Sequence, residues 1–129
     1  MANAQDLFER RKSRPVRCGN LTIGGNAKIS IQTMAKTDTR DIKATVEEIR
    51  EAVSAGADIV RLAVVDEEAA RAIKHIKEQV TCPIVADIHF DYRLAMLALE
   101  SGSDKVRVNP GNIGSKERLL EVARKAQSM

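Results

Sequence analysis

Four short runs of aliphatic and β-branched residues alternate along the chain with four stretches in which apolar residues recur every three or four positions. The short runs span residues 29–34, 58–64, 84–89 and 105–109. This alternation predicts four β-strands, each followed by an amphipathic helix. Because only a helix-length connection returns the chain to begin another parallel strand, we expect one parallel sheet with right-handed crossovers.

Capping and breaking residues mark the ends of the predicted helices. They span residues 41–55 with a stop at Gly56, a stripe through Ala69, Ile73, Ile76 and Val80 with a stop at Pro83, residues 91–101 with a stop at Gly102, and the residues after Ser115. Glycine just past the last periodic residue ends a helix, and a serine such as Ser115 favours the N-cap. The fold class is therefore α/β.

A β-hairpin and a basic arm are predicted ahead of the first unit. The segment "VRCGNLTIGG" has two short apolar runs around Gly19 and Asn20, which is typical of a hairpin. The run "ERRKSRPVR" supplies most of the basic excess, so we expect a solvated arm over residues 1–15 and a folded unit over residues 16–129. A nucleic-acid patch is the alternative, but aromatic residues, on which bases stack, make up only 2% of the chain.

Alternate strands of the predicted sheet resemble each other. The segments "AGADIVRL" (55–62) and "SGSDKVRV" (101–108) lie two units apart and share a helix-ending glycine, an aspartate and a Val-Arg-aliphatic strand. Similar alternate strands are expected in a (β/α)₈ barrel, where each interior layer is filled by alternate strands. A whole barrel needs about 250 residues, so this chain of 129 residues predicts a partial TIM barrel of four βα units.

Strand parity places polar side chains inside this half barrel. Residues of equal parity share a face, and the uniformly aliphatic class should face the helices. The polar class then points into the barrel near the carboxyl ends of the strands: Arg61, Asp87, His89, Arg107 and Asn109. Two arginines facing one aspartate leave a positive surplus, which predicts an anionic ligand. A structural ion pair and a hydrogen-bonded core histidine are the alternatives.

Two loops favour a phosphorylated ligand over a carboxylate. In "NPGNIGSKE" (109–117), the backbone N–H groups of Gly111, Asn112 and Gly114 precede a helix and are candidates for phosphate oxygens. The loop "KTDTRD" (36–41) follows the first strand and adds Arg40 as a cation. Each signal alone is weak, because Gly-Asn turns before helices are common for steric reasons.

Cysteine spacing and hydropathy exclude several classes of protein. Cys18 and Cys82 lie in different segments with no metal-ligand spacing, so we expect two reduced thiols and no metal site. No apolar run approaches the roughly 18 residues of a membrane span, and "MANAQDLFERRKSR" has no apolar core of a signal peptide. A cytoplasmic location is expected.

Five motifs in order resemble the amino-terminal half of the barrel of the (E)-4-hydroxy-3-methylbut-2-enyl diphosphate synthase family. They are "RPVRCGNLTIGG", "ISIQTMAKTDTRD", "AGADIVRLAV", "VADIHFDYRLA" and "DKVRVNPGNIG". The resemblance implies reductive opening and dehydration of 2-C-methyl-D-erythritol 2,4-cyclodiphosphate, with electrons from flavodoxin or ferredoxin. It also implies a homodimer, and a [4Fe-4S] cluster held by three cysteines and a glutamate of a carboxyl-terminal domain.

The resemblance also implies roles for residues at matching positions. Diphosphate contacts fall on Arg61, Arg107 and Asn109; cavity-lining catalytic candidates are Asp87 and His89; the remaining candidates on this side are Asn112, Asp38, Thr39 and Arg40. The remaining four strands and the cluster domain are not part of this sequence, so we expect the isolated chain to bind no cluster and to catalyse nothing. Alternatives are a phosphate-binding barrel of the dihydropteroate synthase type and a non-enzymatic half barrel that pairs with itself.

Overall fold

The computed structural model describes residues 11–129, so residues 1–10 of the predicted basic arm lie outside the described residues. The elements in chain order are β1 (Val16–Cys18), β2 (Leu21–Ile23), β3 (Gln32–Met34), α2 (Ile42–Ser54), β4 (Ile59–Val64), α3 (Glu67–Lys77), β5 (Ile84–Ile88), α4 (Tyr92–Glu100), β6 (Lys105–Val108) and α5 (Lys116–Ser128). The predicted hairpin and the four βα units are all present.

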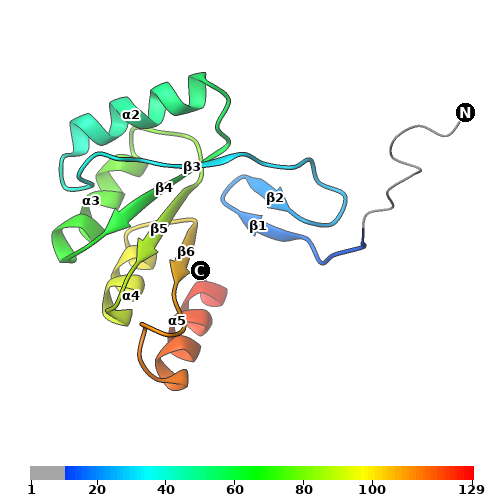
Figure 1. Ribbon diagram of the computed structural model, residues 1–129, viewed down its shortest axis with the longest axis vertical. Helices are drawn as coiled ribbons and strands as arrows, with labels where there is room; N and C mark the ends of the chain where they lie inside the picture. Colours follow the sequence, from blue (N-terminus) through cyan, green and yellow to red (C-terminus); the bar gives the residue numbers. More distant parts are fainter. Residues whose placement is uncertain (1–10) are drawn as a thin grey trace, which may run out of the picture.

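The four-stranded sheet has the order β3-β4-β5-β6 with every neighbouring pair parallel. The hairpin β1-β2 forms a separate antiparallel sheet. Figure 1 shows the four helices along one side of the open, fanned sheet and the hairpin apart from them, near the end where the strands begin. Sequential parallel strands with helical crossovers are the arrangement of a partial TIM barrel, which confirms the predicted fold class.

Each helix begins with a side-chain cap directly after a strand and its loop. The caps of α2, α3 and α4 are aspartates, and Ser115 caps α5 by accepting a hydrogen bond from the Arg118 N–H, as predicted. Capping fixes the point at which each loop ends, and so fixes the loops at the carboxyl ends of the strands. No helix in the described part of the chain is long and apolar enough to cross a membrane.

Two element boundaries differ from the prediction by more than one residue. Strand β3 begins at Gln32 instead of residue 29, because Gln32 aligns with Ile59, the first residue of β4. Ile31 is still bonded to Asp58 and Ile59 at the start of β4. Helix α3 ends at Lys77, so Val80 lies beyond it, although Val80 still packs against the core. The chain needs residues 78–83 to turn back toward the start of β5.

The aliphatic faces of β4 and β5 form the core beneath the helices. Val60, Leu62 and Val64 alternate with residues of the opposite face and pack against the apolar stripes of the helices. Fully burying a side chain of this size contributes about 1.5–3 kcal/mol. On the opposite face, Ile59 and Val85 pack against the hairpin. The hairpin therefore closes the inner face at the end where the strands begin.

The repeated segments share a clamp at the starts of the strands. The Asp58 carboxylate accepts a hydrogen bond from the Ile31 N–H at 2.8 Å, and the Asp104 carboxylate accepts one from the Ile84 N–H at 2.8 Å. In both copies the aspartate N–H donates back to the carbonyl of the same partner residue. The shared aspartate of the sequence repeat therefore has a structural role at the strand starts. The filling of interior barrel layers by alternate strands does not account for this role.

Candidate functional site

One carboxylate and two guanidinium groups meet on the inner face of the sheet. Asp87 Oδ2 accepts from Arg61 Nε at 3.1 Å and lies 3.0 Å from Arg61 Nη2, while Asp87 Oδ1 accepts from Arg107 Nη1 at 3.3 Å. The three residues come from β4, β5 and β6, and Asp87 aligns with Arg107 in the register. Strand parity therefore brings them together as predicted. We call Arg61, Asp87 and Arg107 the interior cluster.

His89 lies at the edge of the interior cluster. It follows the last residue of β5, and its Nε2 is 3.5 Å from Asp87 Oδ2. Its side chain is 48% exposed, so it is not a buried core histidine. The ring also lies near Phe90, with centroids 6.4 Å apart. His89 is therefore accessible to a ligand and close enough to Asp87 to be oriented by it.

The interior cluster carries more positive than negative charge. The Asp87 side chain is only 2% exposed, so its single charge is enclosed, whereas the two arginines keep part of their surface open. Guanidinium groups bind phosphate and carboxylate oxygens through several N–H donors in a fixed plane. The arrangement can therefore bind an anion on the open side of the two arginines.

The loop after β6 is organised by Asn109. Its side-chain oxygen accepts from the Gly111 N–H at 3.0 Å, and its carbonyl accepts from the N–H groups of Asn112 and Ile113. Two of the three amides predicted as phosphate donors are therefore engaged within the loop. Of these three, only the Gly114 N–H has no hydrogen-bond partner among residues 11–129. Ile113 is buried in the core and anchors the loop. The side-chain amide of Asn109 keeps its N–H donors for other partners.

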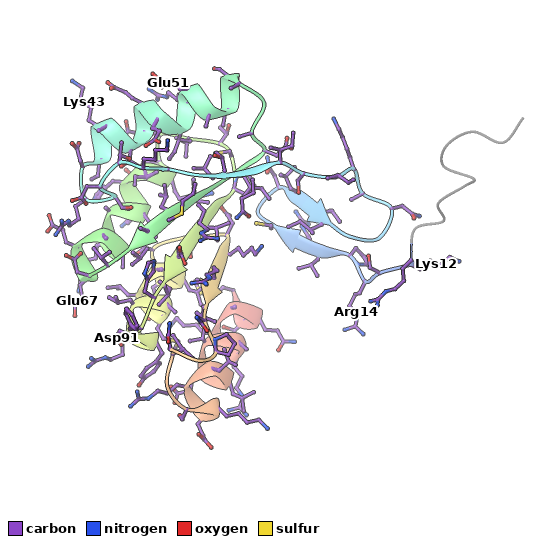
Figure 2. The ribbon with its side chains drawn as sticks, in the orientation of Figure 1. Lys12, Arg14, Lys43, Glu51, Glu67 and Asp91 are labelled. Atoms are coloured by element: carbon purple, nitrogen blue, oxygen red, sulfur yellow. The ribbon has the colours of Figure 1, made fainter. Side chains whose placement is uncertain are left out.

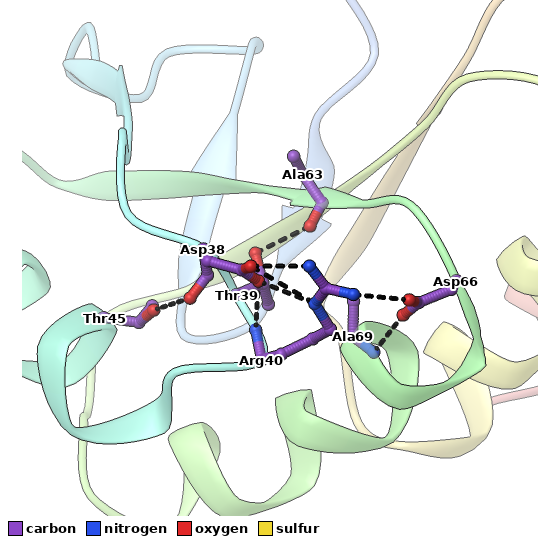
Figure 3. A network of polar contacts seen from close by, with 7 residues as sticks. All are labelled: Asp38, Thr39, Arg40, Thr45, Ala63, Asp66 and Ala69. Carbon is purple, nitrogen blue, oxygen red and sulfur yellow. Dashed lines mark hydrogen bonds and ion pairs between the residues drawn. The ribbon is translucent and has the colours of Figure 1, made fainter.

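The loop between β3 and α2 carries a second group of charges at its surface, shown in Figure 3. Arg40 donates to both carboxylate oxygens of Asp38, the shortest bond being 2.7 Å, and to Asp66 at 3.0 Å. The hydrogen bond from Arg40 lowers the pKa of Asp38 to about 2. We call Asp38, Arg40 and Asp66 the rim cluster. Two carboxylates thus contact Arg40, the residue that the sequence predicted as an additional cation of the site.

Thr39 is turned toward the protein interior. It is buried, and its hydroxyl donates to the Ala63 carbonyl oxygen at 2.6 Å, next to the end of β4. The neighbouring Thr45 hydroxyl donates to the Asp38 carbonyl at 3.0 Å. These bonds attach the loop to β4 and to α2. The predicted site residues of this loop are thus brought to the correct end of the sheet, but their polar groups are engaged by the protein itself.

Glu48 holds the same loop from inside α2 and was missed by the sequence analysis. Its carboxylate accepts from the N–H groups of Lys36 and Thr37 at 2.9 Å each. Although partial burial acts in the opposite direction, these backbone N–H groups hold the pKa of Glu48 below its usual value. A glutamate in the middle of a helix gives no local signal for such a bond, because its partner depends on how the loop folds back.

The cysteines lie away from these clusters. Cys18, the last residue of β1, is buried between the hairpin and the sheet, and burial raises the pKa of its thiol; burial likewise raises the pKa of Cys82. Among residues 11–129, no group of three or more histidine, cysteine, aspartate or glutamate side chains could hold a metal ion.

Solved structures share the fold of this chain. Dihydropteroate synthase from Xanthomonas albilineans in complex with 7,8-dihydropteroate matches with a TM-score of 0.68 and 18% identity, over 88% of this chain and 47% of that chain. The carboxyl transferase domain of Rhizobium etli pyruvate carboxylase with pyruvate matches with a TM-score of 0.53 and 18% identity, over 78% of this chain and 25% of that chain. At these identities the likeness shows the fold alone.

Sequence relatives are much closer. The 4-hydroxy-3-methylbut-2-en-1-yl diphosphate synthase (flavodoxin) of Bacillus cytotoxicus is 55% identical over 95% of this chain and 33% of that protein. The proteins of the same name from Bacillus mycoides and Dehalococcoides mccartyi are 56% and 54% identical over 94% of the chain. The chain spans about a third of the length of these relatives. The family model of the GcpE TIM-barrel domain matches residues 13–129, and the chain therefore belongs to the GcpE TIM-barrel family.

Proposed function

We propose that residues 16–129 form the first half of the substrate-binding barrel of a 4-hydroxy-3-methylbut-2-en-1-yl diphosphate synthase. The whole enzyme would reductively open and dehydrate 2-C-methyl-D-erythritol 2,4-cyclodiphosphate. The names and identities of the relatives support this activity. The observation that carries the role of this half is the interior cluster, in which two arginines enclose one buried aspartate and keep donors for an anion.

Within this proposal, Arg61 and Arg107 bind the diphosphate, and the side-chain amide of Asn109 donates a further hydrogen bond. Support comes from the part-exposed guanidinium groups and from the Asn109 oxygen, whose bond to Gly111 fixes the orientation of the amide. His89 is the group that exchanges a hydrogen bond or a proton with the substrate, since it is the exposed titratable neighbour of the cluster. Arginines suit phosphate oxygens because they remain charged and present planar donors.

The remaining candidate residues, which lie in the loops after β3 and β6, have a different role in this proposal. Asp38, Thr39 and Arg40 shape the entrance without binding the substrate, because their polar groups already bind other parts of the chain. Asn112 lies on the exposed loop beside Asn109 and contacts the substrate only through its side chain, since its N–H is engaged.

The iron–sulfur cluster does not fit the residues of this chain. The sequence contains two cysteines, too few for a site of three cysteines and a glutamate, and Cys18 is only 1% exposed within an apolar cluster. We therefore assign the cluster ligands to other parts of the whole enzyme. In the same proposal the whole enzyme is a cytoplasmic homodimer, with flavodoxin or ferredoxin as electron donor, and this half alone is inactive.

The test is the replacement Arg107→Met in the full-length enzyme, with turnover of the cyclic diphosphate as the measurement. Loss of a charge-assisted bond to phosphate should raise the KM by roughly 10- to 100-fold. Arg50→Met is the matched control, because Arg50 is an exposed arginine on α2 that donates to the Gln79 carbonyl away from the interior cluster. Unchanged KM and kcat in the Arg107 variant would contradict the proposed binding site.

A further inference from the structure

Asp87 lies deeper than the two arginines that contact it. Its side chain is 2% exposed, whereas the side chains of Arg61 and Arg107 are 30% and 42% exposed. A ligand that enters from the open face therefore meets guanidinium groups before it meets the carboxylate. We propose that Asp87 is a positioning residue that holds the two guanidinium groups at a fixed separation for phosphate oxygens, and that it exchanges no proton with the substrate. This inference rests on the proposed function.

The bonds of Asp87 divide its two oxygens between the two arginines. Oδ2 takes both the Nε of Arg61 at 3.1 Å and its Nη2 at 3.0 Å, and Oδ1 takes the Nη1 of Arg107 at 3.3 Å. Each guanidinium group is thus fixed to a different oxygen of one carboxylate. A guanidinium group has more N–H donors than these bonds use, so both groups keep donors for a ligand.

The arginines have little else to fix them. Within residues 11–129, Asp87 is the only carboxylate that forms an ion pair with either Arg61 or Arg107. A free arginine side chain has roughly 2 kcal/mol of rotamer entropy, and two neighbouring guanidinium groups repel each other. Without Asp87, both side chains would turn apart toward solvent. Ligand binding would then have to overcome their repulsion and their rotamer entropy, which would weaken the affinity.

Two other roles for Asp87 lead to different expectations. As a proton acceptor it would need an oxygen that the substrate can reach, but the carboxylate is enclosed by its cationic partners. If Asp87 acted only through its charge, it would repel an anionic ligand, so removing the charge should tighten anion binding. The positioning role predicts the opposite sign, namely weaker binding when the charge is removed.

The experiment measures binding of inorganic pyrophosphate to the full-length enzyme by titration calorimetry. Asp87→Asn keeps the shape of the side chain but cannot accept both guanidinium groups, and we expect the Kd to rise at least about tenfold. Asp104→Asn is the matched control, because Asp104 is also a shielded carboxylate, 14% exposed and bonded to Lys77 at 2.6 Å. It lies at the opposite end of the sheet, so its variant should bind pyrophosphate as the wild type does.

Two more variants extend the test, and the first keeps it decisive if Asp87→Asn unfolds. Asp87→Glu retains the charge but moves the carboxylate. The positioning role therefore predicts weaker pyrophosphate binding, whereas a charge-only role predicts unchanged binding. In the Arg61→Met background only one guanidinium remains to be positioned, and the loss caused by Asp87→Asn should become much smaller than in the wild type. In turnover, the Asp87→Asn defect should appear in the KM, whereas the loss of a proton acceptor would lower kcat.

Three outcomes would overturn the positioning role: unchanged or tighter pyrophosphate binding in Asp87→Asn, equal losses in the two backgrounds, or a defect confined to kcat. Failure of the proposed function looks different. In that case the wild-type enzyme would bind no pyrophosphate, or Arg107→Met would leave KM and kcat unchanged. The two results are separate because the first compares variants of Asp87, whereas the second concerns the anion site itself.

Discussion

Two groups of three charges lie at the same end of the sheet and have opposite compositions. In the interior cluster one carboxylate is enclosed by two guanidinium groups, and in the rim cluster one guanidinium is enclosed by two carboxylates. They also differ in burial, since the side chain of the central residue is 2% exposed in the interior cluster (Asp87) and 41% exposed in the rim cluster (Arg40). Water can reach all three members of the rim cluster, whose side chains are 41–50% exposed, whereas the carboxylate of the interior cluster is shielded from it. The difference teaches that the composition of an ion cluster indicates a ligand only where water is restricted.

The largest effect is expected when the interior cluster loses its carboxylate. Asp87→Ala leaves two guanidinium groups facing each other beside a buried gap, and breaking a buried ion pair costs about 3–5 kcal/mol. We expect the free energy of unfolding to fall by that amount in urea denaturation. A loss below about 1 kcal/mol would mean that the interior cluster contributes no more to stability than a solvated surface cluster.

A smaller loss of stability is expected at Thr39, which joins the loop between β3 and α2 to β4. Thr39→Val keeps the shape of the buried side chain and removes the hydroxyl that donates to the Ala63 carbonyl, leaving that oxygen without this bond. The loss should be about 1–3 kcal/mol by thermal or urea unfolding. Thr39→Ser, which retains the donor, should be closer to the wild type. Equal stability of the valine variant and the wild type would contradict a structural role of this bond.

Replacing the whole interior cluster by apolar residues separates stability from binding. In the triple variant Arg61→Met, Asp87→Leu, Arg107→Met, no charge is left unpaired, and buried ion clusters are often no more stabilising than apolar side chains. We expect unfolding within about 1 kcal/mol of the wild type, together with complete loss of pyrophosphate binding. A strongly destabilised triple variant would mean that the interior cluster is retained for stability instead of ligand binding.

The sequence predicted the interior cluster better than the rim cluster, and the reason is the range of the interactions. Strand parity is a local rule, so the inward direction of Arg61, Asp87 and Arg107 follows from the alternation of each strand with its aliphatic neighbours. Arg40 contacts Asp38, two positions away, but also Asp66, 26 positions away, and no local pattern reveals this second contact. The same limit applies to Glu48.

The loop of residues 109–117 and the hairpin were predicted as elements but not in their contacts. The glycines and asparagines of "NPGNIG" correctly indicated a tight turn before a helix, yet the turn is closed by Asn109, which uses two of the amides expected to be free. The hairpin was predicted from its turn residues, but its packing against Ile59 and Val85 is a tertiary contact. Turn chemistry and periodicity thus predict where elements form, whereas the partners of their polar groups depend on the assembled fold.

The smallest effect is expected from Arg40→Gln in the rim cluster. The variant removes the donor that lowers the pKa of Asp38 to about 2 from its ordinary 3.8, so that pKa should return toward 3.8 in a carboxyl ¹³C NMR titration. Because the folded-state pKa is depressed, the contribution of this pair to stability is present above pH 3.8 and is lost as the pH falls toward 2. Near neutral pH the exposed pair should contribute little to the unfolding midpoint, and added salt should reduce it further. A large midpoint loss at neutral pH, or an Asp38 pKa that stays near 2, would show that the rim cluster is held by something other than its own charges.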